Sequence, residues 1–293
     1  MHQSFSPRLV LIAVFTMFLM SGVPVIIKAI SANEISIGIV RLAIATLGTA
    51  AIFTIQKGYL RFQIGDLKWM FALGCIFAAH WFLYFKSVKT STASLAAIAV
   101  STYGIQLLLL SWISYGDKVR LIDSLALALA FAGVLIAAPQ FELQPDAYHG
   151  FILGLISGTF YALLPLINRK AYHLGTNRKA LGQFGFGLLC FLPFWSWGQW
   201  QLTLDDWIGL VVLGVVGTLI AHTLWIKVST ELPPKFTAAI YYIYIPLTMM
   251  LSAIFLEEPI TATKIIGALC IIAGNLMIVL GHSEPTRKTA DDS

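Results

Sequence analysis

The feature that most constrains this chain is a series of apolar segments, each about as long as a bilayer-crossing helix. Such a helix needs roughly 20 predominantly apolar residues. We predict ten of them, at 9–29, 35–56, 67–86, 92–115, 121–138, 150–168, 180–199, 207–227, 236–256 and 261–281. The connections between them are short and leave no space for a soluble domain. The pattern therefore predicts an all-α membrane protein with ten transmembrane helices.

Composition supports this class and argues against others. Hydrophobic residues make up 58% of the chain and charged residues 11%, whereas soluble domains carry about 25% charged residues. The net charge of +5 comes from basic residues scattered between apolar segments. Because they form no single basic patch, we do not expect nucleic acid as a partner. The expected surroundings are a lipid bilayer.

Lys and Arg are distributed unevenly between the two sides of the predicted bundle. If the N-terminus is cytoplasmic, fourteen lie on the inner side and four on the outer side, namely Lys28, Lys86, Lys89 and Lys264. Cytoplasmic loops are enriched in basic residues, so we expect both termini in the cytoplasm and, for a bacterial protein, location in the inner membrane. Trp residues around one outer loop are typical of an interfacial belt: Trp195, Trp197, Trp200 and Trp207.

The two halves of the chain match weakly when one is shifted by 141 or 142 residues. The shift pairs His80 with His222 and Pro24 with Pro165, and the matches keep their order along five successive helices. An odd number of helices in each half makes the second half enter the membrane from the opposite side. We therefore predict two inverted five-helix repeats, the plan of many secondary transporters. Their predicted bounds are 1–139 and 148–281, followed by a polar tail, 282–293, that we expect to be disordered.

Several local patterns, taken in order, resemble the drug/metabolite transporter superfamily, in the branch with paired EamA-type repeats. They are the end of the first helix at 21–28, Arg41-Leu42, the segment 93–98 with its echo at 236–240, and the acidic helix ends at 116–117 and 257–259. The resemblance implies a ten-helix transporter whose central cavity is lined by helices one to four and six to nine. Helices five and ten would pack at the side.

Ionisable residues within the predicted spans are candidates for a site because burying them in a bilayer is costly. Lys28 and Arg41 could hold a carboxylate or phosphate, and the planar fork of Arg suits two oxygens. Alternatively, Lys28 extends to the outer interface and Arg41 pairs with backbone carbonyls. His80 and His222 could face the cavity from both halves and couple proton movement to transport. The alternative for each histidine is a hydrogen-bonded position in the core.

Polar and aromatic residues on the fourth and ninth helices are further candidates. Tyr241, Tyr244 and Thr248 share one face of the ninth helix, and Gln106 is the repeat mate of Thr248. Tyr103 lies beside the matching face of the fourth helix. These side chains could line a cavity for a small amphipathic molecule, or they could simply pack against neighbouring helices.

The leading functional prediction is a secondary transporter of a small organic metabolite, with an amino acid or related carboxylate as first choice. Export is implied by the family resemblance alone. Transport of a phosphorylated or nucleotide-linked solute is the alternative, and it requires both Lys28 and Arg41 at the cavity. An enzyme is disfavoured because the sequence lacks paired carboxylates at one depth, a zinc motif and a nucleophile elbow. We expect no cofactor and no metal, and a homodimer is a candidate assembly.

Overall fold

The structure is a computed structural model that describes residues 7–55, 64–115, 120–139, 142–231 and 240–281. The predicted tail at 282–293, Asp117 and most of the segment 236–240 lie outside these residues. The described residues form helices and no strand. In chain order the helices are α1 (Pro7–Ser21), α2 (Val23–Ala29), α3 (Glu34–Ile55), α4 (Ile64–Thr90), α5 (Ala93–Val100), α6 (Tyr103–Tyr115), α7 (Leu121–Ala137), α8 (Pro145–Lys170), α9 (Thr176–Phe191), the 3₁₀ helix η1 (Leu192–Trp197), α10 (Leu204–Gly214), the π-helix η2 (Val215–Ile220), α11 (Ala221–Glu231), α13 (Tyr244–Leu256) and α14 (Ala262–Gly281).

The helices coincide with the apolar segments of the sequence. Seven stretches are long and apolar enough to cross a membrane: Pro7–Ala29, Glu34–Ile55, Ile64–Thr90, Ala93–Ser114, Pro145–Asn168, Thr176–Trp197 and Leu204–Ser229. Three shorter apolar helices follow the remaining predicted segments: Leu121–Ala137, Tyr244–Leu256 and Ala262–Met277. This arrangement is that of a multi-pass membrane protein. The count of ten spans and the inversion of the halves stay predictions.

Several helices are interrupted inside the apolar segments. The first breaks at Gly22, two residues before Pro24, which lies in the first turn of α2 where its missing N–H is tolerated. Turns also separate α5 from α6 at 101–102 and precede α13 at 242–243. These last two turns are 141 residues apart, the shift found in the sequence. By contrast, α8 continues through Pro165 without interruption.

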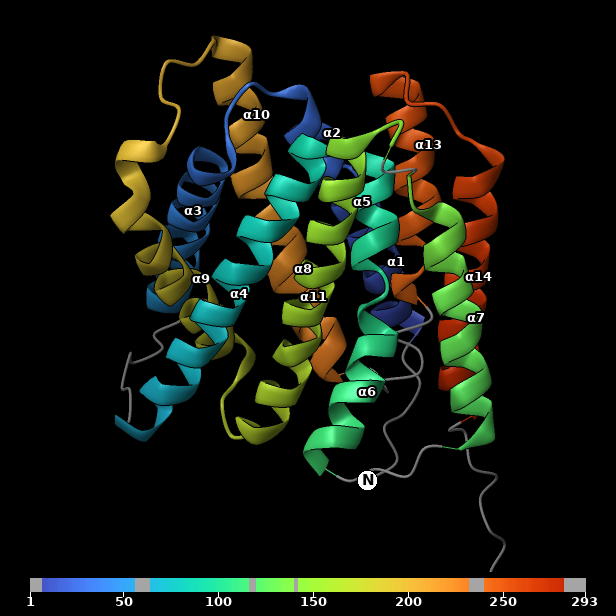
Figure 1. Ribbon diagram of the computed structural model, residues 1–293. Helices are drawn as coiled ribbons and strands as arrows, with labels where there is room; N and C mark the ends of the chain where they lie inside the picture. The colour runs from blue at the N-terminus through green and yellow to red at the C-terminus, as the bar shows by residue number, and fades with distance from the viewer. Residues whose placement is uncertain (1–6, 56–63, 116–119, 140–141, 232–239, 282–293) are drawn as a thin grey trace, which may run out of the picture.

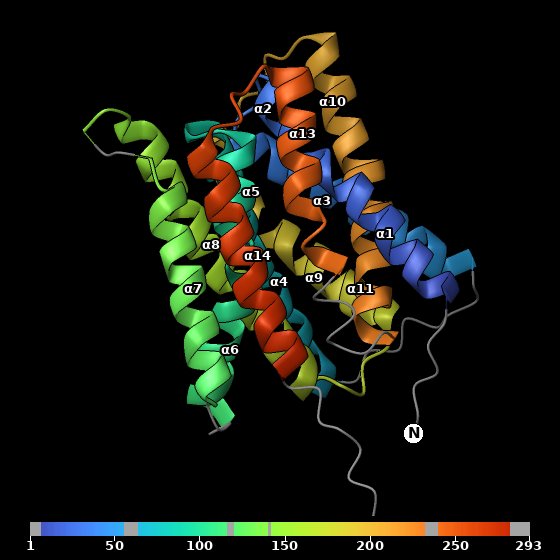
Figure 2. The ribbon, with the colours of Figure 1, turned by 90° about the vertical axis from the view of Figure 1, so that its right-hand side faces the viewer.

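Glycines allow close helix contacts. Helices α7 and α14 lie side by side at one edge of the molecule (Figures 1 and 2). A Cβ atom added at Gly133 or at Gly267 would lie 2.7 Å from the carbonyl oxygen of the other. On α8, a Cβ added at Gly154 would lie 2.7 Å from the Cβ of Ala99 on α5. The backbones therefore approach more closely than larger residues would permit.

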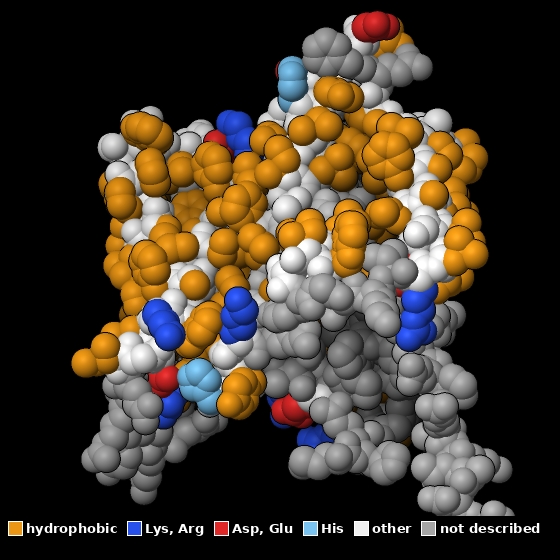
Figure 3. Space-filling model, turned by 60° about the horizontal axis from the view of Figure 1, so that its bottom comes forward, with side chains coloured by type: hydrophobic (Ala, Val, Ile, Leu, Met, Phe, Trp, Pro, Cys, Tyr) orange, Lys and Arg blue, Asp and Glu red, His pale blue; other side chains and the backbone are white. Residues whose placement is uncertain are grey.

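The sides of the bundle are apolar. Leu47, Ile113, Phe131 and Ile254 are among the large hydrophobic side chains that remain exposed. Figure 3 shows apolar side chains over the side of the molecule, with most of the visible Lys and Arg below them. An exposed apolar surface of this kind is expected where lipid, rather than water, surrounds the protein.

Candidate functional site

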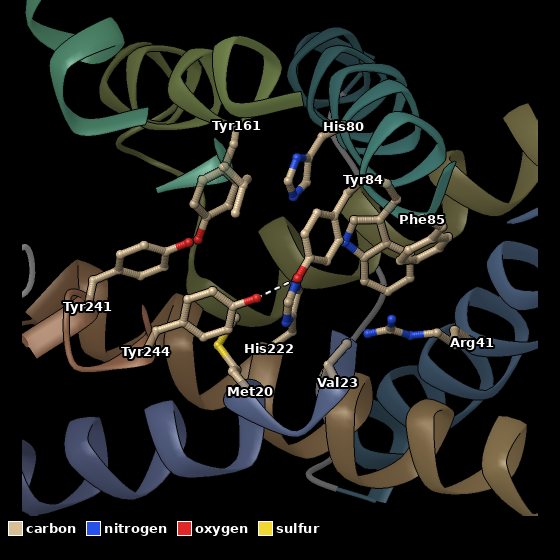
Figure 4. A pocket seen from close by; sticks show the side chains of 12 residues that line it. Met20, Val23, Arg41, His80, Tyr84, Phe85, Tyr161, His222, Tyr241 and Tyr244 are labelled. Carbon is tan, nitrogen blue, oxygen red and sulfur yellow. Dashed lines mark hydrogen bonds between the residues drawn. The ribbon is translucent and has the colours of Figure 1, made fainter. Parts of the chain in front are cut away.

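A small cavity of about 40 Å³ lies at the centre of the bundle. Its lining comes from both halves of the chain (Figure 4): Met20, Val23, Arg41, His80, Trp81, Tyr84, Phe85, Val100, Tyr161, His222, Tyr241 and Tyr244. This volume accommodates water, whereas pockets for small organic ligands measure roughly 300–1,000 Å³. A metabolite would therefore enter only if the surrounding helices moved apart.

Among the described residues, Arg41 of α3 is the one Lys or Arg in this lining, and it is 1% exposed. Its Nε donates a hydrogen bond to the Thr218 hydroxyl at 2.9 Å, and Thr218 donates in turn to the Leu213 carbonyl at 2.8 Å. Thr218 belongs to η2, and the wider turn of a π-helix suits this hydrogen bond between residues five positions apart. The π-helix thus positions the hydroxyl that orients Arg41.

The rest of the Arg41 guanidinium faces aromatic rings rather than acids. Its Cζ lies 4.2 Å from the ring centroid of Trp81 and 5.0 Å from that of Phe85. Its Nη1 is buried and has no hydrogen-bond partner. Within the described part of the chain, no Asp or Glu forms an ion pair with it. Cation–π contact offsets part of the cost of burying the charge, and the unused donor remains available to an anion.

The two predicted histidines both line the cavity but differ in their surroundings. Ser157 donates to the His80 carbonyl at 2.9 Å, and its own hydroxyl lies 2.8 Å from His80 Nδ1. That arrangement assigns the Nδ1 proton to His80 and leaves Nε2 as an acceptor in the neutral ring. His222 Nδ1 is buried with no hydrogen-bond partner. The described residues contain no cluster of three His, Cys, Asp or Glu that could hold a metal.

Tyrosines from both halves complete the cavity. The hydroxyls of Tyr84 and Tyr244 are hydrogen-bonded across it (Figure 4). Tyr161 accepts a hydrogen bond from Trp225 Nε1 at 2.9 Å, and its ring lies 4.7 Å from that of His80. The predicted Tyr241 and Tyr244 are therefore joined by other tyrosine rings in one aromatic wall.

Some lining residues were not among the predicted site residues. Tyr161 is the clearest case, and a signal for it exists in the sequence. Tyr161 lies on α8, three residues after Gly158. The glycines of α8 bring this helix against α5 and α6. A large aromatic residue directly beyond such a contact points into the space between the helices. Met20 and Val23 lie beside the Gly22 break and carry no comparable signal.

Three predicted polar residues lie outside the cavity lining. Gln106 donates to the Thr102 hydroxyl at 3.0 Å and to the Leu155 carbonyl at 3.1 Å. Thr248 donates to the Ser21 carbonyl at 3.2 Å. Tyr103 packs behind the lining, with its ring 4.9 Å from that of Tyr161. Gln106 and Thr248 thus connect helices through hydrogen bonds, and Tyr103 connects them through ring packing.

Lys28 also lies outside the lining, in the last turn of α2, and α2 lies at the upper end of the bundle in Figure 1. Its ammonium donates to the carbonyls of Lys89 and Ser91 at 2.9 and 2.5 Å. Lys89 donates back to the Ile30 carbonyl. Lys28 therefore ties α2 to the connection between α4 and α5.

Two carboxylates connect the halves at the same end. Glu258 accepts hydrogen bonds from the backbone N–H groups of Ala93 and Ser94, at 2.7 and 3.1 Å, and thus caps the N-terminus of α5. Asp206 accepts from the backbone N–H and hydroxyl of Ser31 at 2.7 and 2.6 Å. These contacts join the two halves at the upper end of the bundle.

Comparisons with known proteins agree with this architecture. The chain is 22% identical over 230 residues to the uncharacterized transporter YxxF of Bacillus subtilis, a match covering 77% of this chain and 74% of the relative. It is 25% identical over 249 residues to the uncharacterized transporter YetK of the same organism, covering 80% and 74%. An uncharacterized transporter of Archaeoglobus fulgidus is 28% identical over 247 residues, covering 80% and 77%.

A crystal structure of a protein superposes with a TM-score of 0.66 at 15% identity, covering 95% of this chain and 99% of that one, which shows a shared fold. The sequence model of the EamA-like transporter family matches twice, at residues 8–138 and 149–280. The two matches together cover most of the chain, one in each half. The chain therefore belongs to the EamA-like transporter family, within the drug/metabolite transporter superfamily.

Proposed function

We propose that this protein is a secondary transporter of a small organic anion, with an amino acid or related carboxylate as the leading candidate. The observation that carries the proposal is the buried guanidinium of Arg41, which has an unused donor and no acidic partner among the described residues. A buried charge without a counter-ion is costly, and a bound carboxylate would supply that counter-ion. Two oxygens match the guanidinium fork.

The remainder of the cavity suits the rest of such a molecule. Aromatic rings supply apolar walls, and the hydroxyls of Tyr84, Tyr161 and Tyr244 supply hydrogen-bonding groups. An α-ammonium group would be held by the faces of tyrosine rings, since the lining contains no Asp or Glu. The carboxylate is favoured over a phosphorylated solute because only one of the two predicted basic residues, Arg41, lines the cavity.

Alternating access would move the solute from one side to the other. The cavity is lined from both halves, and hydrogen bonds also join the halves at the upper end of the bundle. In the proposed inverted repeat of five helices per half, exchanging the conformations of the halves would change the side to which the cavity opens. We propose cytoplasmic termini and, by family analogy, export.

Two experiments test this proposal. In a thermal-stability screen of purified protein against amino acids, organic acids, sugar phosphates and nucleobases, a ligand at tenfold its Kd should stabilise the protein by about 1.4 kcal/mol. Carboxylates should give the largest shifts and should then be transported in proteoliposomes. A response confined to phosphorylated solutes would contradict the carboxylate assignment.

The topology is tested separately with single cysteines in a cysteine-free background. Gly65 lies in the first turn of α4, and Gln144 directly precedes α8. The first turns of these two helices lie at opposite ends of the bundle (Figure 1). Gly65→Cys and Gln144→Cys should label with a membrane-impermeant maleimide from opposite sides. Labelling of both from one side would overturn the proposed arrangement of spans.

A further inference from the structure

A second cavity lies on the side of the bundle and shares no residue with the central one. It measures about 420 Å³ and lies between α4 on one side and α9 with η1 on the other, below the start of α3. Its lining is mostly apolar: Asn33, Glu34, Ile35, Cys75, Ala78, Ala79, Phe82, Cys190, Phe191, Phe194 and Trp197. We call this cavity the lateral groove. The transport mechanism proposed above makes no use of it.

The lateral groove is elongated along the helices. On α4 the lining residues follow the i, i+3, i+4, i+7 spacing of one helix face, namely Cys75, Ala78, Ala79 and Phe82. The same face continues to Lys86, so it extends about 16 Å at 1.5 Å per residue. The side chains of Ala78 and Ala79 are small and therefore leave space in the groove. A long, narrow space of this kind suits an extended hydrocarbon chain.

The lateral groove opens onto the lipid-facing surface. Phe82 and Phe194, on its two walls, are 39% and 41% exposed. Trp197 at one end is 70% exposed, and Trp195 stacks on Trp200 close by, with ring centroids 4.1 Å apart. Exposed Trp residues are typical of the membrane interface. One end of the groove therefore lies at head-group level, while its body lies in the hydrocarbon region.

Opposite charges stand side by side at the interfacial end. Lys86 Nζ lies 2.9 Å from Glu34 Oε1, and the side chain of Lys86 is 47% exposed. Asn33 fixes this end, since its Nδ2 donates to the Trp197 carbonyl at 2.8 Å and its Oδ1 accepts from Ser36 N–H at 3.1 Å. A fixed pair of one cation and one anion complements a head group that itself carries one of each.

We propose that the lateral groove is a binding site for a zwitterionic phospholipid with a primary ammonium head group, such as a phosphatidylethanolamine. One acyl chain lies between α4 and α9, the phosphate contacts Lys86, and the ammonium group lies at Glu34. Because α4 also carries His80, Trp81 and Tyr84 of the central cavity, the lipid packs against the back of a helix that forms the transport site. This inference does not depend on which solute is transported.

The native cysteines provide the test. Cys75 and Cys190 line the lateral groove, whereas Cys270 lies on α14 and serves as an internal control. Purified protein at constant detergent concentration is labelled with a lipophilic maleimide, with or without dioleoyl phosphatidylethanolamine, and the labelled peptides are quantified by mass spectrometry. The phospholipid should slow labelling of Cys75 and Cys190 several-fold and leave Cys270 unchanged. Equal rates with and without phospholipid would overturn the proposal.

Head-group recognition is tested with other lipids and variants. Lys86→Gln should weaken the protection several-fold, whereas Lys68→Gln, a matched change near the other end of α4, should have no effect. Ala79→Leu should abolish the protection by filling the groove, and its unfolding temperature shows whether the fold is retained. Equal protection by phosphatidylglycerol would overturn the zwitterion assignment, and equal protection by oleic acid would overturn the phospholipid assignment.

Discussion

The centre of the molecule and its upper end use charged side chains in opposite ways. At the upper end, Lys28 donates to two carbonyls and Glu258 accepts from the backbone at the start of α5. At the centre, Arg41 Nη1 and His222 Nδ1 are buried with no hydrogen-bond partner. Both regions join the two halves of the chain, yet only one has its charged groups fully paired.

We propose that this difference separates groups that hold the structure together from groups that bind a ligand. A buried polar group without a partner costs about 1–3 kcal/mol, and a buried charge costs more. We propose that such a cost persists at the centre because Arg41 binds the transported anion. At the upper end, the paired charges stabilise the contact between the two halves. Removing the central charge should therefore lower ligand affinity and not stability, whereas removing a charge at the upper end should lower stability and not ligand affinity.

The largest effect is expected for Arg41→Met. This variant should lower the affinity for the transported anion at least about 100-fold, or about 2.7 kcal/mol, because the cation that recognises it is gone. Its unfolding temperature should not fall, since an unpaired buried charge is replaced by an apolar side chain of similar length. Transport in proteoliposomes and thermal unfolding measure the two effects. Unchanged transport would remove Arg41 from the site.

Lys28→Met should behave in the opposite way. Two carbonyls at the connection between α4 and α5 would lose their donor, at a cost of about 1–3 kcal/mol in the free energy of unfolding. Ligand affinity should stay within a few-fold of the native protein, because Lys28 is not part of the cavity lining. Chemical denaturation and ligand titration test the pair of expectations. A loss of affinity matching that of Arg41→Met would place Lys28 in the site.

The histidines provide a smaller contrast within the cavity. The double variant with His80→Gln and His222→Gln should flatten the pH dependence of transport if these residues carry the coupled proton. Of the two single variants, His222→Gln should change the pH dependence of transport more than His80→Gln, because His80 is already held by Ser157. Transport rates in proteoliposomes between pH 6 and pH 8 provide the measurement. An unaltered pH profile in the double variant would exclude histidine coupling.

The smallest effect is expected for Tyr84→Phe. It removes the hydroxyl that is hydrogen-bonded to Tyr244, which should cost about 1 kcal/mol in stability and reduce ligand affinity only a few-fold. Tyr172→Phe is a matched control, since Tyr172 is 83% exposed and distant from the cavity lining. Equal effects of the two variants would show that the Tyr84–Tyr244 contact contributes nothing specific.

The sequence predicts most of the helices because hydrocarbon imposes a simple condition on length and polarity. The sequence also singles out Arg41, His80 and His222, which line the central cavity, since ionisable residues in the middle of an apolar segment are conspicuous. The sequence does not tell that Arg41 lines the cavity and that Lys28 lies outside it. That distinction depends on carbonyls at Lys89 and Ser91, which tertiary structure brings to Lys28.

Tertiary contacts and one change of helical geometry explain other differences between prediction and structure. Thr248 lies one turn after Tyr244 in the same uninterrupted helix α13, but its hydroxyl donates to the Ser21 carbonyl of α1. The π-helix at 215–220 brings Thr218 to Arg41, and nothing in the hydropathy pattern marks that change of helical geometry. Periodicity assigns a residue to a segment, and tertiary packing decides which neighbour it contacts.

The most direct test of the contrast between centre and upper end is calorimetric titration of a transported carboxylate into the native protein, Arg41→Met and Lys28→Met. We expect the native protein and Lys28→Met to bind with Kd values within a few-fold of each other and Arg41→Met to show no measurable heat of binding. Native-like binding by Arg41→Met would contradict the assignment of Arg41 as the anion-binding residue, and with it the proposed substrate class.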